Sequence, residues 1–285
     1  MEKIKINPIL RKETKVRMRT WRAPFLLAIY IGILTFIAAF ALFNTIFAQH
    51  NQGFNYNDIT TSYAVLAGIQ FLLIAFIIPA LTSSAISNER ERQTLDLLLC
   101  TKLKPSSIII GKLITSISQI LLLIVSSLPV FSIIFLFGGI SIKEIAQLLG
   151  YYIILAVTFG SIGMFFSTYI KKTTTSTVLT YGTILFLMLG TLIISAFYVS
   201  IKYRYNPNPT IQRLPLMYFN PGAGFVSMVM EQFGKGSSIG IPGIVKLGPL
   251  PFWAVNMIID IIISVVMLSL SIYKLDPMKK KRAKS

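Results

Sequence analysis

The sequence predicts an all-α integral membrane protein with six transmembrane helices. An amphipathic interfacial helix precedes them, a short cytoplasmic helix lies between spans two and three, and short re-entrant or outer helices lie between spans five and six. Of the 285 residues, 54% are hydrophobic and only 13% are charged, whereas soluble domains carry about 25% charged residues. The mean hydropathy is +0.71. We expect residues 1–285 to form a single transmembrane domain.

The six spans follow from the lengths of the apolar runs. A membrane-spanning helix needs about 20 mainly apolar residues, because each residue advances the helix by about 1.5 Å through a hydrocarbon layer of about 30 Å. Six stretches meet this requirement, and none has a Lys or Arg in its interior. They cover residues 24–47, 63–86, 113–137, 145–169, 176–199 and 252–274.

The distribution of Lys and Arg predicts the orientation. Residues 1–23, 87–112, 170–175 and 274–285 hold eight, five, two and six of them, which is 21 of the 27 in the chain. Short cytoplasmic segments of membrane proteins are enriched in Lys and Arg. Both termini and residues 87–112 are therefore expected in the cytoplasm. Anionic lipid headgroups explain the net charge of +17 better than a nucleic acid does, because the basic residues stand beside apolar segments.

Two flanking segments have patterns of their own. Residues 1–22 mix apolar and basic side chains, which is typical of a helix in the headgroup layer, although a disordered basic tail would also fit. Between Pro221 and Gly234 lies an apolar stretch too short to span. It predicts one or two helical turns that re-enter the membrane or cap the outer end of the bundle, the alternative being a plain surface loop.

A charged patch interrupts the apolar sequence between spans two and three. Asn88 is placed to cap a helix with Glu91 as its third residue. Leu95, Leu98 and Leu99 follow at the spacing of one helix face. The pattern predicts an amphipathic helix of about three turns with charges of both signs at its head. Mixed charges favour docking to a protein, since charge complementarity fixes register. A surface loop that dips its leucines into the membrane interface is the alternative.

These residues resemble those of a known family, the six-span membrane subunits of type-2 ABC transporters of bacteria. The resemblance covers nearly the whole chain, but only the patch is motif-like. The family usually has a small residue, often glycine, before Thr94, where this chain has Gln93. The matching positions are Glu89-Arg90-Glu91-Arg92, Thr94-Leu95, Leu103, Pro105, Ile109 and Gly111-Lys112.

The resemblance implies a permease subunit of an ATP-driven exporter in the bacterial cytoplasmic membrane. The patch would be the coupling helix, which docks into a groove of a separate ATPase. Two ATPase subunits would bind ATP and Mg²⁺, and a second permease subunit, identical or different, would complete the transporter. The four charged residues would make polar contacts with the ATPase, and the three leucines would pack against the cytoplasmic helix ends of this chain. The implied coupling residues are Asn88, Glu89, Arg90, Glu91, Arg92, Thr94, Leu95, Leu98, Leu99, Gly111 and Lys112.

The sequence itself offers no nucleotide site. A phosphate-binding P-loop needs Gly-Lys followed by Ser or Thr, but Gly111-Lys112 precedes Leu113 and Gly234-Lys235 precedes Gly236. ATP is therefore expected on a partner chain, and no cofactor on this one. One cysteine and one histidine leave too few groups for a metal site or an intramembrane protease.

Span six carries the one carboxylate within the predicted spans, Asp260, with Asn256 one turn before it. Because a carboxylate in the membrane is costly, it usually faces the bundle interior or water. The pair is predicted either to mark the substrate route or to serve as hydrogen-bonded structural groups. A secondary transporter or channel not driven by ATP is the alternative function. Such a protein would show charged or broken helices near the midplane and usually an internal repeat.

Overall fold

The computed structural model describes residues 21–52, 56–95, 105–136, 140–205, 214–234 and 250–275. These residues form helices and no β-strand. The predicted interfacial helix over residues 1–22 and the C-terminal basic segment lie almost entirely outside the described residues. The elements are α2 (Arg22–Gln52), α3 (Tyr56–Thr82), α4 (Ser87–Glu91), α6 (Pro105–Ser126), α7 (Leu128–Leu136), α8 (Ile142–Tyr169), α9 (Thr173–Leu185), the π-helical turn η1 (Phe186–Gly190), α10 (Thr191–Tyr205), the 3₁₀ helix η2 (Pro215–Phe219), α11 (Pro221–Gln232) and α12 (Phe252–Leu275).

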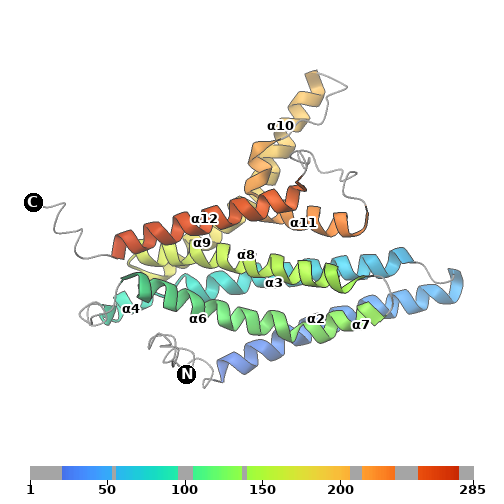
Figure 1. Ribbon diagram of the computed structural model, residues 1–285, viewed down its shortest axis with the longest axis horizontal. Coiled ribbons are helices and arrows are strands. Elements are labelled where there is room, and N and C mark those ends of the chain that lie inside the picture. The colour runs from blue at the N-terminus through green and yellow to red at the C-terminus, as the bar shows by residue number, and fades with distance from the viewer. Residues whose placement is uncertain are drawn as a thin grey trace, which may run out of the picture.

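Six stretches of helix in the described part of the chain are long and apolar enough to cross a membrane, which confirms the predicted architecture. Three are the single helices α2, α8 and α12. The second continues from α3 to the end of α4, the third joins α6 to α7, and the fifth joins α9 to α10. In Figure 1 these helices run along one common direction, except that α10 projects away from the bundle.

Helix α8 lies at the centre of the bundle and is the most buried span. Its main neighbours are α12, α3, α6 and α9. Tyr151, Tyr152 and Phe159 are fully buried in its first half and centre. Nearer the other end, a Cβ added to Gly163 would come within 3.0 Å of the Thr82 Cβ. Glycine therefore permits the close approach of α8 to α3, as small residues do between membrane helices.

Two spans are interrupted, each for a local reason. Between α6 and α7, Ser127 donates its hydroxyl to the carbonyl of Ile124 at 2.7 Å, and Pro129 follows without an N–H to continue the ladder. Between α9 and α10 the helix widens into η1, where the Phe186 ring covers the Gly190 Cα. The second interruption is where α10 leaves the bundle (Figure 1).

The predicted short helix before span six is present as α11. It is longer than expected, beginning at Pro221 and ending at Gln232. Asn220 caps it, accepting from the Ala223 N–H at 3.0 Å and donating to the Met188 carbonyl at 2.8 Å. Phe225 and Met228 pack into the main core, so α11 closes the end of the bundle opposite α4 (Figure 1).

Candidate functional site

The short helix predicted in the charged patch is present as α4, but it ends at Glu91, before the predicted leucine face. It spans five residues, Ser87–Glu91, at the end of the bundle where α2 begins and α12 ends (Figure 1). Leu98 and Leu99 lie outside the described residues, so their packing stays a prediction. The short helix sits between α3 and α6 in the chain and contacts α9 in space.

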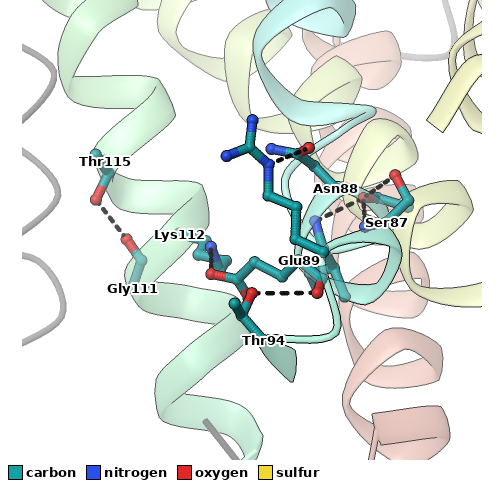
Figure 2. Close-up of polar contacts among 10 residues, drawn as sticks. Ser87, Asn88, Glu89, Thr94, Gly111, Lys112 and Thr115 are labelled. Carbon is teal, nitrogen blue, oxygen red and sulfur yellow. Dashed lines mark hydrogen bonds and ion pairs between the residues drawn. The ribbon is translucent and has the colours of Figure 1, made fainter. Parts of the chain in front are cut away.

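The cap predicted at Asn88 is wrong. The helix begins at Ser87, two residues before the start that a cap at Asn88 would give, and the N–H groups of Ile86 and Ser87 donate to the Ser167 hydroxyl of α8 at 2.8 and 3.0 Å. The Asn88 side chain instead accepts from Arg92 Nε at 3.2 Å (Figure 2). A capping oxygen is needed at a helix start, and here it comes from a residue 80 positions away. No local pattern could have revealed it.

The C-terminus of α4 explains the position at which the chain departs from the family pattern. Gln93 has φ of 58°, the left-handed conformation. The Thr94 N–H donates to the Glu89 carbonyl at 2.9 Å, and the Gln93 N–H to the Arg90 carbonyl at 3.1 Å. These two bonds form a Schellman motif, whose left-handed residue is usually glycine. The small residue common in the family therefore fits this backbone better than Gln93 does.

Glu89 connects α4 to α6 through an ion pair. Its Oε1 lies 2.7 Å from the Lys112 Nζ (Figure 2). The pair is largely shielded from solvent, with side chains 22% and 6% exposed. Glu89 Oε2 is buried and has no hydrogen-bond partner among the described residues. Gly111, which precedes the lysine, is buried and accepts at its carbonyl from the Thr115 hydroxyl.

Arg90 and Glu91 connect α4 to two further spans. Arg90 Nη2 donates to the Thr168 carbonyl near the end of α8 at 3.0 Å. Glu91 accepts from the Thr173 N–H at 2.8 Å and from the Thr173 hydroxyl at 2.9 Å. Lys172, the residue that precedes α9, supplies no side-chain cap. Glu91 therefore caps α9 from another helix, and its charge also suits the positive end of that helix dipole.

Leu95 anchors the chain that follows α4 by apolar packing. Its side chain is buried in a cluster formed at this end of the bundle by Ile86, Ile108, Ile109, Leu113, Met164 and Leu275. The predicted packing of Leu95 against the chain's own helix ends is thus observed. Five residues remain exposed, and we call them the α4 tip: Asn88, Glu91, Arg92, Gln93 and Thr94.

At the opposite end, Asn256 joins α12 to two other elements. Its Nδ2 donates to the carbonyls of Tyr218 and Asn220 at 2.8 and 3.1 Å, and its Oδ1 accepts from the Tyr151 hydroxyl at 3.0 Å. A Cβ on Gly224 would collide with the Asn256 amide and come within 2.6 Å of the Tyr151 hydroxyl. The predicted site residue thus lies in a tightly packed polar junction.

Asp260 is only 2% exposed, one turn further along α12. It lies on the buried stripe of that helix with Asn256 and Ser264. The Thr158 hydroxyl of α8 donates to the main-chain carbonyl of Asp260 at 3.3 Å. Asp260 and Asn256 therefore share one face, as predicted, and that face meets α8.

A sequence model for the ABC-2 family of transporter proteins matches residues 7–279 of this chain. The match covers nearly the whole sequence, so the chain belongs to the ABC-2 transporter family. It is a multi-pass membrane protein and a permease of an ABC transporter. The resemblance inferred from the charged patch is thereby confirmed. A comparison with curated proteins finds no significant match.

Sequence reasoning missed the partners of α4. Ser167, Thr168 and Thr173 are unremarkable polar residues around the loop between spans four and five. Their roles depend on long-range hydrogen bonds across about 80 positions. The one available signal was Lys171-Lys172, which placed that loop on the same side of the membrane as α4.

Proposed function

We propose that this chain is the permease subunit of an ATP-driven exporter, and that α4 transmits movement from a separate ATPase to the spans. The observation that carries the proposal is the attachment of α4. Glu89, Arg90 and Glu91 bind three different helices, α6, α8 and α9. A force applied to the α4 tip would therefore reach three spans at once, as rigid-body coupling between a motor and a gate requires.

The ATPase would dock on the α4 tip. Within the described part of the chain, no side-chain hydrogen bond or ion pair joins Asn88, Arg92 or Gln93 to another span. These exposed side chains are therefore available to a partner. Leu98 and Leu99 would complete the packing side of the segment, with Leu95. Gly111 and Lys112 lie in α6, the helix to which Glu89 attaches α4, and would not contact the ATPase.

The complete transporter would contain two ATPase subunits and a second permease subunit, identical or different. ATP and Mg²⁺ would bind to the ATPases, and this chain would bind no cofactor of its own. The assembly would lie among the lipids of a bacterial cytoplasmic membrane, with α4 and both termini in the cytoplasm. The common end at which α2 begins, α12 ends and α4 sits supports this topology (Figure 1).

The docking role is tested by reversing the charge of Arg92, whose side-chain hydrogen bond is to Asn88 and not to another span. Arg92→Glu leaves the bonds to α6, α8 and α9 in place, so the permease is expected to fold normally. We expect co-purification of the ATPase and transport-linked ATP hydrolysis to fall by about tenfold, a loss of the size that one charged interface contact supports. Arg204→Glu, an exposed arginine of α10, is the matched control and is expected to change neither.

Unchanged assembly and coupling in Arg92→Glu, and also in the joint charge reversal of residues 89–92, would contradict the docking role. Transport by the purified chain in liposomes, driven by an ion gradient without an ATPase, would instead favour a secondary transporter.

We also keep Asn256 and Asp260 as proposed residues of the substrate route. A buried carboxylate within a membrane-spanning helix is costly, which supports a functional role. Their contacts with α8 and α11 equally support a role in helix packing. Replacing Asp260 by Asn preserves size and polarity. Loss of transport with an unchanged melting temperature would support the route, and unchanged transport would end that proposal.

A further inference from the structure

A cavity of about 520 Å³, lined mainly by polar and charged residues, opens at the end of the bundle opposite α4. Its volume falls within the range of small-molecule sites. Helix α8 lines it with Lys143, Glu144 and Gln147, α11 with Glu231 and Gln232, and α12 with Trp253. None of these residues takes part in the attachment of α4, so the cavity is a separate feature.

The cavity brings together two carboxylates that lie 87 positions apart in the sequence. Among the described residues, no Lys or Arg forms an ion pair with either Glu144 or Glu231. The chain as a whole has 27 basic and 10 acidic residues, so two acids in one cavity run against its charge bias.

Hydrogen bonds hold the cavity walls in place. Trp253 Nε1 donates to Glu231 Oε2 at 2.6 Å, and the Ser141 N–H donates to Glu144 Oε2 at 2.7 Å. Gln232 Nε2 donates to the Glu144 carbonyl at 3.1 Å, which joins α11 to α8. In both carboxylates these bonds use Oε2, and Oε1 remains outside them.

The lining suits an organic cation better than a metal ion. An indole ring is the best aromatic partner for a cation, especially for an alkylated ammonium group. Mg²⁺ and Ca²⁺ need six or more oxygen ligands at short range. The described residues contain no group of three or more His, Cys, Asp or Glu that could hold a metal.

We propose that this cavity binds an ammonium group through Glu144, Glu231 and Trp253. The group would belong either to a lipid headgroup at that face of the membrane or to a free organic amine. Lys143, which also lines the cavity, would oppose binding through its positive charge. This repulsion would be stronger for a ligand with two positive charges, so the cavity would favour singly charged ligands.

The chain offers a direct reporter, because Trp21 and Trp253 are its only two tryptophans. In a Trp21→Phe background, Trp253 fluorescence is titrated with tetramethylammonium and with choline at constant ionic strength. The uncharged choline analogue 3,3-dimethylbutanol serves as the matched ligand control. We expect a saturable change with the two cations and none with the alcohol. An equal response to the alcohol would overturn the proposal, and so would saturation by Ca²⁺ or Mg²⁺ at lower concentration.

Substitutions test the charges in opposite directions. Glu144→Gln with Glu231→Gln keeps hydrogen-bond acceptors at both positions and is expected to weaken choline binding by about tenfold or more. Lys143→Gln is expected to tighten it by about twofold to threefold, because each unit charge near a site shifts binding by a modest factor in partly exposed surroundings. Unchanged affinity in Lys143→Gln together with unchanged affinity in the double variant would overturn the proposal.

The two sources of the ammonium group are separated in nanodiscs. A shifted Trp253 emission in phosphatidylethanolamine discs relative to phosphatidylglycerol discs, without added ligand, would identify a lipid headgroup. A response only to soluble choline in phosphatidylglycerol discs would identify a free amine. Both results support the site, and no response in either disc, with or without choline, contradicts it.

Discussion

Glu91 of α4 accepts two hydrogen bonds from Thr173, one from its N–H and one from its hydroxyl, and thereby caps α9. The cap joins the loop between spans two and three to the start of span five. Replacing Glu91 by Ala is expected to destabilise the start of α9 by about 1 kcal/mol, the usual value of a helix cap. Amide hydrogen exchange in the first turn of α9 should rise.

Arg92→Ala is the matched control for this cap, because Arg92 bonds only within α4. In Arg92→Ala, amide hydrogen exchange in the first turn of α9 is expected to stay at the wild-type level. Equal protection of α9 in Glu91→Ala and in the wild type would show that the cap contributes nothing.

The ion pair between Glu89 and Lys112 gives a second prediction. Lys112→Met removes one partner of a largely buried pair and leaves a carboxylate without its cation. Such changes cost about 3 kcal/mol or more. The double variant Glu89→Gln with Lys112→Met is expected to be more stable than Lys112→Met alone. Thermal unfolding of the purified chain measures both, and additive losses would contradict the direct interaction.

The left-handed conformation of Gln93 predicts a stabilising substitution. Glycine adopts positive φ without the steric cost of about 1 kcal/mol that a Cβ brings. Gln93→Gly is therefore expected to stabilise the end of α4 by about 0.5–1 kcal/mol. Gln93→Val should destabilise it, since a β-branched residue fits this region worst. A lower melting temperature for the glycine variant than for the valine variant would contradict the observed geometry.

The junction at Asn256 predicts a glycine requirement at one position. Gly224→Ala places a methyl group against the Asn256 amide and the Tyr151 hydroxyl, so the junction must open. The expected loss is about 1–3 kcal/mol, as for other overpacked sites. Gly150→Ala is the control, because nothing lies within 4 Å of a Cβ there. Equal melting temperatures for the two variants would contradict the packing.

The spans were predictable from the sequence because a membrane imposes long apolar runs, and the charged patch stood out against them. Local pattern also identified the approximate place of α11, whose proline start is visible in the sequence. The cap at Asn88 failed because a residue of α8, Ser167, satisfies the start of α4. Likewise, Glu89 and Arg90 looked like free docking charges, and only the folded chain shows their partners in α6 and α8.

The most direct test of the coupling role is a contact measurement at the α4 tip. A photo-crosslinking amino acid is placed at Asn88, which is exposed and bonds only within α4. The same probe at Ile142, exposed at the far end of α8, is the control. The coupling role predicts a crosslink to the ATPase from position 88 and none from position 142. Absence of any crosslink from position 88 in an active, assembled transporter would contradict it.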